Sequence, residues 1–305
     1  MFENLMNLKW VAIAVLAIPL AAGCKRGQKA PEGSSAQDVQ AKQSIQNIGS
    51  DTMVNLAQAW AEQYAKVVPG VSIEVSGGGS GVGVAALING TAQIANCSRK
   101  LEPEEAEKAK KANGKDPKEF LVGFDGLAVF VHKDNPLDQI SLEELGEIYR
   151  EGGSINKWSD LKVTVPSGGK DEIVRVSRQN NSGTYQYFRE TVVGKKKDFK
   201  SGSLDMNGSK EVVELIAKTV GAIGYSGLGY ATAGVKILKI AKVKGEPGVA
   251  PSIAAVHDKS YPISRPLYMY TPGEPNAVTA AYINWIMGDA GQKIVQETGY
   301  IPLVK

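Results

Sequence analysis

The chain contains very little cysteine and histidine. Among its 305 residues it has two of each, Cys24, Cys97, His132 and His257. The two histidines lie far apart, and no cysteine or carboxylate cluster accompanies either of them. Protein metal sites usually combine three or four such side chains. The sequence therefore predicts no metal site and no other cofactor.

The chain also lacks a strong charge of either sign. It has 35 basic and 32 acidic residues, which gives a formal charge of +3. Nucleic-acid-binding domains usually have a basic face, and no basic stripe interleaved with aromatic residues occurs here, so we expect no nucleic-acid partner. With 43% apolar and 22% charged residues, the chain has a globular composition and is long enough to form two lobes.

Long apolar runs are scarce as well. The run from Trp10 to Leu20 has about 11 residues, too few to span a bilayer but suitable for the core of a signal peptide. It leads into Leu20-Ala-Ala-Gly-Cys24, which resembles the bacterial lipobox, where cleavage precedes the cysteine and the thiol is lipidated. We therefore expect a signal peptide over residues 1–23, a lipidated Cys24 and a flexible tether over residues 24–43.

This N-terminal pattern also predicts the compartment. We expect an exported protein, anchored by the lipid at Cys24 on the outer side of the cytoplasmic membrane or in the periplasm. Once Cys24 is lipidated, Cys97 is the remaining thiol, so no internal disulfide is expected. The apolar segment around Cys97 predicts an inert buried thiol. We expect a monomer.

The folded part, from residue 44 onward, repeats a strand, a turn and a helix. Strands are expected over 44–48, 71–75 and 93–97. Such repeats are typical of an α/β fold with ligand-binding loops at the carboxyl ends of parallel strands. An apolar strand over 121–131 could cross between two lobes. Further helices are expected after Thr52, through Leu87, from Ser141, and over 102–112, 209–219, 276–287 and 290–298. A helix is also expected after Thr184, with Tyr185, Phe188 and Val192 on one face. Further strands are expected over 172–177, 221–225, 235–243 and 262–271.

Three turns share a composition that suits an anion. They are Gly49-Ser-Asp-Thr52, Gly79-Ser-Gly81 and Ser182-Gly-Thr184, and each lies at the expected start of a helix. Glycine lets the backbone approach closely, hydroxyls donate adjustable hydrogen bonds, and helix N-termini favour negative charge. Arg178 adds a planar set of donors that matches phosphate or carboxylate. Together these residues predict a buried oxyanion surrounded by donors.

Several of these residues also have simpler explanations. The stretch from Arg178 to Gln186 could be an ordinary capped helix, with Ser182 or Thr184 as the cap and Arg178 as a surface charge. Asp125 is as typical of a turn as of a ligand. We expect Arg99 to pair with the acidic helix that follows it rather than to face a ligand.

The sequence signatures of common enzyme classes are missing or incomplete. No Walker sequence and no Gly-x-Ser-x-Gly motif occurs, and Gly81-Val-Gly-Val-Ala-Ala86 lacks the acidic residue that dinucleotide sites carry about 20 positions later. A serine hydrolase would also need a placed histidine. We therefore expect no catalytic residues and a binding protein. The alternatives are a carrier of sulfate, molybdate or tungstate, or a phosphatase that uses the same anion cradle.

A series of short motifs runs through the folded part of the chain. They are Gly49-Ser-Asp-Thr-Met53, Gly77-Gly-Gly-Ser-Gly81, Ile94-Ala-Asn-Cys-Ser-Arg99, Asp125-Gly126, Arg178 with Asn181-Ser-Gly-Thr184, Gly221-Ala-Ile-Gly-Tyr225 and Tyr261-Pro-Ile-Ser-Arg-Pro-Leu-Tyr268. Their order resembles that of the phosphate-binding lipoproteins of bacterial ABC phosphate importers, in the group with shorter chains. The resemblance covers roughly residues 44–305.

The resemblance implies a two-lobe periplasmic-binding-protein-like fold of type II. Each lobe would be a mixed sheet flanked by helices, and the class is α/β. We expect lobe I at 44–127 plus 264–305 and lobe II at 128–263. Inorganic phosphate held between the lobes, and ABC permease subunits that receive it for uptake, are the implied partners.

The resemblance also implies which residues hold the ligand. In the longer relatives an aspartate occupies the position of Ser98, where a carboxylate accepts the proton of monohydrogen phosphate and so disfavours sulfate. Here Asp51 could accept that proton, or could only be the cap of its helix, so phosphate is less firmly implied than an oxyanion in general. The implied phosphate-binding residues are Ser50, Asp51, Thr52, Met53 through its N–H, Ser80, Gly81, Ser98, Arg178, Ser182, Gly183 and Thr184.

Overall fold

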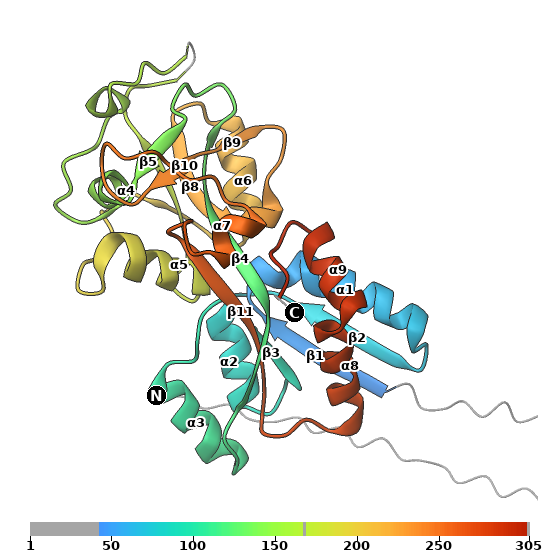
Figure 1. The fold of residues 1–305 in the computed structure, drawn as a ribbon. Helices are drawn as coiled ribbons and strands as arrows, with labels where there is room; N and C mark the ends of the chain where they lie inside the picture. Colours follow the sequence, from blue (N-terminus) through green and yellow to red (C-terminus); the bar gives the residue numbers. More distant parts are fainter. Residues whose placement is uncertain (1–42, 167–168, 304–305) are drawn as a thin grey trace, which may run out of the picture. The chain divides into compact units, whose positions relative to one another are not determined.

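A computed structural model of the chain describes residues 43–166 and 169–303. The expected signal peptide, the expected lipidation site at Cys24 and the expected tether up to residue 42 lie outside the described residues. Within them, strands and helices alternate along most of the chain (Figure 1). No helix of the described part is both long and apolar enough to cross a membrane.

A nine-stranded mixed sheet runs through the described residues, in the order β2-β1-β3-β11-β4-β8-β6-β7, with β9 also paired to β4. The pairs β1–β2, β1–β3, β6–β7 and β6–β8 are parallel, and the pairs of β4 and β11 are antiparallel. The strands are β1 (Gln43–Gly49), β2 (Val71–Ser76), β3 (Ile94–Cys97), β4 (Lys118–His132), β6 (Val174–Arg178), β7 (Leu204–Met206), β8 (Ala222–Gly227), β9 (Val235–Ile237) and β11 (Ser264–Thr271), with a separate parallel pair of β5 (Gln139–Ser141) and β10 (Lys239–Ala241).

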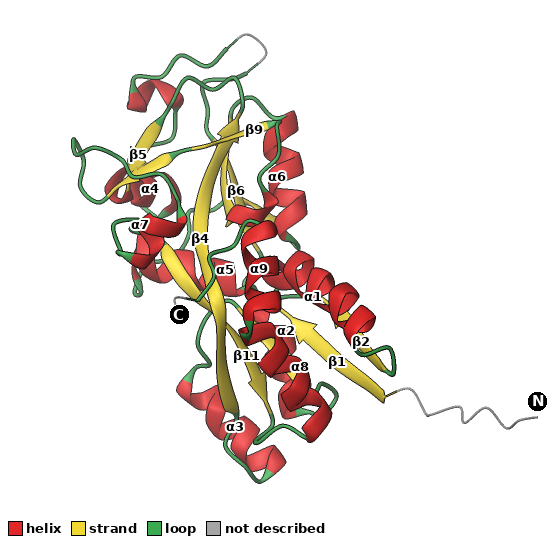
Figure 2. Ribbon diagram, turned by 45° about the vertical axis from the view of Figure 1, so that its right-hand side comes forward, coloured by secondary structure: helices red, strands yellow, loops and turns green. Residues whose placement is uncertain are grey.

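Strand β4 is common to two parts of this sheet (Figure 2). From Lys118 to Gly126 it pairs with β11, and from Leu127 to Val131 it pairs with β8. We call β1, β2, β3, β11 and β4 up to Gly126 the first sheet half, and β4 from Leu127 with β6, β7, β8 and β9 the second sheet half. The long strand that the apolar run predicts is therefore present and joins the two halves.

Helices cover both faces of the first sheet half. Ile94 and Met269 pack in one core cluster with Trp60 of α1, whereas the neighbouring Ala95 and Tyr268 pack in another with α2. Adjacent residues of a strand point to opposite faces, so α1 and α2 lie on opposite sides of the sheet. The elements here are the 3₁₀ turn η1 (Asp51–Met53), α1 (Val54–Val67), α2 (Ser80–Ile88), α3 (Pro103–Asn113), α8 (Ala277–Met287) and α9 (Asp289–Glu297).

The second sheet half is covered in the same way. Phe130 packs with α6 in one cluster, and its neighbours Val129 and Val131 pack with Tyr149 of α4 and Phe188 of α5 in another. The elements here are α4 (Leu142–Tyr149), η2 (Trp158–Leu161), α5 (Gly183–Phe188), the π-helix η3 (Arg189–Gly194), α6 (Ser209–Lys218), η4 (Leu228–Tyr230) and α7 (Ile253–His257).

Two sequence-based expectations need correction. The single strand expected over 235–243 is two short strands, β9 and β10, which pair with different partners. The helix after Thr184 changes to a π-helix at Arg189, and a π-helix has more residues per turn than an α-helix. As a result Val193, 3% exposed, is the buried residue of that last turn, and the expected Val192 is only partly buried.

Candidate anion-binding site

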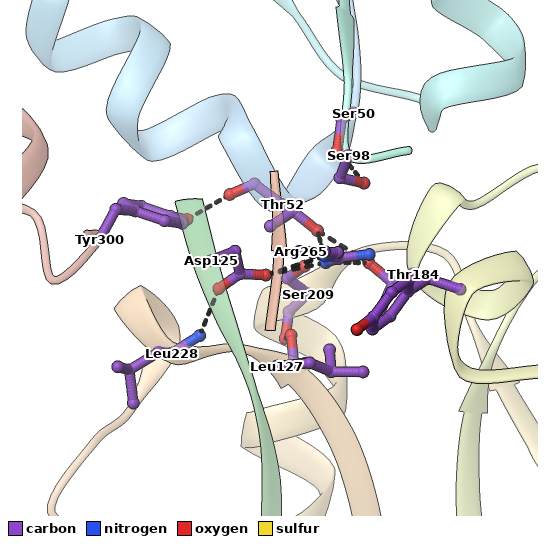
Figure 3. Close-up of polar contacts among 12 residues, drawn as sticks. Ser50, Thr52, Ser98, Asp125, Leu127, Thr184, Ser209, Leu228, Arg265 and Tyr300 are labelled. Carbon is purple, nitrogen blue, oxygen red and sulfur yellow. Dashed lines mark hydrogen bonds and ion pairs between the residues drawn. The ribbon is translucent and has the colours of Figure 1, made fainter. Parts of the chain in front are cut away.

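The three predicted turns follow the carboxyl ends of strands from both sheet halves. Ser50 and Asp51 follow β1, Ser98 follows β3, and Arg178 is the last residue of β6. Ser80 is the first residue of α2 and Gly183 the first of α5. The structure brings these segments into contact. Figure 3 shows the contacts of Ser50 with Ser98 and of Thr52 with Thr184.

Three buried serines form one cluster. The Ser50 hydroxyl donates to Ser98 Oγ at 2.9 Å, the Ser98 N–H donates to Ser80 Oγ at 3.1 Å, and the Ser80 and Ser98 hydroxyls lie 3.4 Å apart. All three side chains are at most 2% exposed. Hydroxyls both donate and accept, so such a cluster can rearrange its hydrogen bonds around an oxyanion.

Two buried threonines meet beside the serines. Thr52 Oγ1 and Thr184 Oγ1 are 2.8 Å apart, although Thr52 follows β1 and Thr184 follows β6. The Thr52 carbonyl accepts a hydrogen bond from the Tyr300 hydroxyl. Burial raises the pKa of Tyr300, so its hydroxyl remains a donor. The threonine pair thus links the two sheet halves directly.

Glycine permits the close contact of the two turns that bring these hydroxyls together. A methyl group on Gly183 would lie 2.4 Å from Ser80 Oγ and 2.7 Å from Ser98 Oγ. Gly79 has a φ of +99°, which favours glycine, and a methyl group there would lie 2.8 Å from the Asn181 carbonyl oxygen. Any larger residue at these positions would push the turns apart.

Some predicted groups have other partners. The Met53 N–H donates to the Ser50 carbonyl at 2.9 Å, and the Gly81 N–H donates to the Asn181 carbonyl at 3.0 Å. Ser182 is the N-cap of α5, because its Oγ accepts from the Thr184 N–H at 3.1 Å. The capped-helix explanation is therefore correct for Ser182, which can still donate its own hydroxyl hydrogen.

Arg178 is not a surface charge, since its side chain is 1% exposed. Its Nη2 donates to Asp51 Oδ2 at 3.1 Å and to the Asn207 carbonyl at 2.8 Å, and its Nη1 donates to Ser209 Oγ at 3.1 Å. Burial lowers the pKa of the guanidinium, and the nearby Asp51 carboxylate opposes that decrease. Arg178 is thus a fixed, buried cation bonded to Asp51, the residue between Ser50 and Thr52.

Asp51 does not cap its helical turn. Ser50 is the N-cap residue, and no side-chain capping bond forms there. Instead Asp51 Oδ1 accepts from the Gly78 N–H at 2.9 Å, and its Oδ2 accepts from Arg178. The carboxylate therefore holds the glycine-rich turn and Arg178 in place.

A second buried arginine, Arg265 of β11, was not among the predicted site residues. Its Nη2 donates to Thr52 Oγ1 at 3.1 Å and to Thr184 Oγ1 at 2.9 Å. Its Nε and Nη2 also donate to Asp125 Oδ2, at 3.1 and 2.9 Å. Asp125 lies inside β4 and is fully buried, so the turn explanation for it is wrong. The sequence signal for Arg265 was a lone charge in the apolar stretch over 262–271.

Other charged groups are placed elsewhere. Arg99 forms a 2.7 Å ion pair with Glu105 of α3, as expected. Among the described residues no group of three metal-ligating side chains occurs. The hydrogen bonds of the Ser50, Ser80 and Ser98 hydroxyls join these serines to one another, and none reaches a histidine within the described ranges. The arrangement is suited to holding an oxyanion.

Comparison with known proteins places the chain in a family. A family model described as a PBP superfamily domain matches residues 34–290. The phosphate-binding protein PstS of Pseudomonas aeruginosa is 35% identical over 283 residues, which cover 90% of this chain and 86% of that protein. The phosphate-binding protein PstS of Staphylococcus aureus is 30% identical over 301 residues, which cover 96% and 88%.

Solved structures agree with this placement. A putative phosphate ABC transporter substrate-binding protein of Clostridium perfringens, with bound phosphate, has a TM-score of 0.76 and 30% identity, over 86% of this chain and all of that one. An ABC-type phosphate transport receptor of Vibrio cholerae has a TM-score of 0.66 and 26% identity, over 85% of this chain and all of that one. The predicted α/β, periplasmic-binding-protein-like fold is confirmed. The chain belongs to the PBP superfamily and, within it, to the family of the bacterial phosphate-binding proteins PstS.

Proposed function

We propose that this protein binds inorganic phosphate and delivers it to the permease subunits of an ABC importer for uptake. One observation carries the proposal: buried hydroxyls from three separate turns converge next to Asp51, which is paired with the buried Arg178. The relatives named as phosphate-binding proteins support phosphate as the anion. The proposed ligands are Ser50, Asp51, Thr52, Met53, Ser80, Gly81, Ser98, Arg178, Ser182, Gly183 and Thr184.

The proposed affinity follows from an energetic balance. A hydrogen bond to a charged group contributes roughly 1.5–3 kcal/mol, so about ten of them would nominally exceed the non-covalent limit of roughly 18–21 kcal/mol. Dehydration of the anion and ordering of the protein offset most of this gain. A micromolar dissociation constant, about 8 kcal/mol, suits reversible capture and release.

We further propose that residues 44–127 with 264–305 form lobe I and residues 128–263 form lobe II, and that the lobes close on the anion. The change in the partner of β4 after Gly126 supports this division. The contacts Thr52–Thr184 and Asp51–Arg178 would then belong to the closed form. Closure would also present a surface to the permease.

Selectivity for phosphate over sulfate needs a group that accepts the proton of monohydrogen phosphate. Ser98 can accept but cannot enforce this preference, because a hydroxyl also donates. We propose Asp51 as the acceptor, since each carboxylate oxygen has a second lone pair besides the one used by Gly78 or Arg178. If Asp51→Asn keeps the full preference for phosphate, Asp51 only positions its two partners.

The proposed setting is extracytoplasmic, with the protein anchored through a lipid on Cys24 and otherwise monomeric. The motif Leu20-Ala-Ala-Gly-Cys24 and the preceding short apolar run support the anchor. Mass spectrometry of the N-terminal peptide from membrane extracts should find Cys24 as the first residue, with acyl groups attached. An unmodified thiol at Cys24 would reject the anchor, and light scattering of a Cys24→Ser variant would measure the oligomeric state.

We propose a carrier without catalysis, which is supported by the serine hydroxyls bonding to one another and to no histidine within the described residues. Calorimetry on the purified protein tests it directly: we expect one phosphate bound per chain at pH 8, displaced poorly by sulfate, molybdate or tungstate. Tighter binding of one of these competitors would identify a different oxyanion carrier. Sustained release of phosphate from a phosphate ester would identify a phosphatase instead.

A further inference from the structure

One nitrogen of a buried arginine in the site has no acceptor among the described residues. Arg265 is 1% exposed, and its Nη1 is buried without a hydrogen-bond partner, whereas its Nε and Nη2 donate to Asp125 and to the two threonines. Burial of a charged donor without an acceptor is unfavourable. The free Nη1 is therefore a feature that a ligand could explain.

The planar geometry of the guanidinium fixes where Nη1 donates. One edge carries the Nε and Nη2 hydrogens, and here it faces Asp125 Oδ2. The next edge carries the second Nη2 hydrogen and one Nη1 hydrogen, which are parallel. Because Nη2 donates across this edge to Thr52 and Thr184, one Nη1 hydrogen points toward the same side as these hydroxyls. Figure 3 shows both threonines beside Arg265.

The other contacts of Arg265 hold it in this orientation. Asp125 Oδ1 accepts from the Leu228 N–H at 3.1 Å, so the carboxylate that binds Arg265 is itself fixed. The ring of Tyr187 covers one face of the guanidinium, 5.6 Å from its central carbon. The edge beside the threonines is therefore already oriented before a ligand binds.

Arg178 differs from Arg265 because all three of its side-chain nitrogens already donate to the protein. Its Nε and Nη2 donate to the protein, through Met206, Asn207 and Asp51, and its Nη1 donates to Ser209. These bonds engage four of the five N–H hydrogens of Arg178, so one Nη1 hydrogen is left for an anion. Arg265 has more to offer, because both hydrogens of Nη1 are unused by the described residues.

We propose that Arg265 is a second cationic ligand of the bound anion and donates to it through Nη1, next to the Thr52 and Thr184 hydroxyls. This inference rests on the proposed function, because it adds a residue to the same site. A positive charge in contact with the anion stabilises a dianion more than a monoanion. Arg265 thus favours the doubly charged form of phosphate.

Calorimetric titration of the Arg265→Gln variant with phosphate at about pH 5.5 and about pH 8.5 tests the proposal, because phosphate carries mainly one charge at the lower pH and mainly two at the higher. We expect at least about tenfold weaker binding at the higher pH, where 1.4 kcal/mol is one decade, and a clearly smaller loss at the lower pH. Arg189→Gln, which removes a cation that pairs with Asp198 at the surface, is the matched control and should leave both affinities unchanged.

The outcomes distinguish a failure of the proposed function, phosphate binding, from a failure of the ligand role proposed for Arg265. Absence of phosphate binding in the wild-type protein would reject the proposed function itself. If the wild type binds, an unchanged affinity of Arg265→Gln, or an equal loss at both pH values, would overturn the ligand role of Arg265, since a purely structural role does not distinguish the charge of the anion. Should Arg265→Gln not fold, Arg265→Lys replaces it in the test. A lysine ammonium bound to Asp125 has no second nitrogen that could take the place of Nη1, so unchanged phosphate affinity of Arg265→Lys would overturn the assignment.

Discussion

Asp51 and Arg178 form a buried ion pair across the two sheet halves. Asp51 Oδ2 and Arg178 Nη2 are 3.1 Å apart, and the two side chains are 13% and 1% exposed. Asp51 follows β1 of the first half, and Arg178 ends β6 of the second. With so little water around it, each charge depends on the other.

Removal of the carboxylate leaves the guanidinium without its counter-charge. In the absence of phosphate we expect Asp51→Asn to lower the free energy of unfolding by about 3 kcal/mol, as for other buried pairs that lose one partner. Chemical denaturation measures this change. Asp198→Asn, which breaks the exposed pair with Arg189, should change the unfolding free energy by less than about 1 kcal/mol. Equal effects of the two variants would contradict the buried pair.

Arg178 should be necessary for tight anion binding. We expect Arg178→Ala to weaken phosphate binding well over tenfold, since one charge-assisted hydrogen bond exceeds the roughly 1.4 kcal/mol of a tenfold change. Asp51, left without its partner, would also repel the anion. Calorimetry gives the dissociation constant, with Arg189→Ala as the surface control. Unchanged affinity in Arg178→Ala would remove this residue from the site.

We expect Gly183 to be needed for closure of the two lobes on phosphate, and not for folding of the chain. Because a methyl group at Gly183 would collide with the Ser80 and Ser98 hydroxyls of the other sheet half, we expect Gly183→Ala to fold but to bind phosphate at least about tenfold more weakly. Gly70 has open space around the same position, so Gly70→Ala should bind normally. Small-angle scattering with and without phosphate measures closure. A compact, fully binding Gly183→Ala variant would show that the turns need not touch.

Cys97 should be unreactive in the folded protein. Burial raises the pKa of its thiol to about 12, so almost no thiolate is present near pH 8. In a Cys24→Ser variant, an aromatic disulfide reagent should modify Cys97 only after denaturation. The unfolded thiol ionises at lower pH than the folded one, so the free energy of unfolding should fall as pH rises from about 9 to about 12. Rapid modification of the native variant would contradict this burial.

Local signals were sufficient to predict most of the first sheet half. The stripe of Leu56, Trp60 and Tyr64 at helical spacing becomes the buried face of α1. Short alternating or apolar runs become β1, β2 and β3, and the glycines and hydroxyls after them become turns at strand ends. These features depend on neighbours in sequence, which is why they could be predicted from the sequence.

The missed features depend on partners that are distant in sequence. Asp125 and Arg265 stand 140 positions apart, and only the pairing of β4 with β11 brings them together. The division of 235–243 into β9 and β10 likewise follows from two different partners, β4 and β5. No local sequence pattern around Arg265 indicates that Thr52 and Thr184 lie beside it in the fold.

The place of β11 in the sheet has a consequence for synthesis. This strand lies between β3 and β4, and Tyr268 pairs with Cys97. A ribosome adds about 5–20 residues per second from the N-terminus, so β3 emerges long before its partner. The core around Trp60 must also wait for Tyr282 and Ile286 of α8. The segment that begins the fold is therefore the last to be completed, and a nascent chain interrupted near residue 260 leaves its N-terminal region exposed to chaperones and proteases.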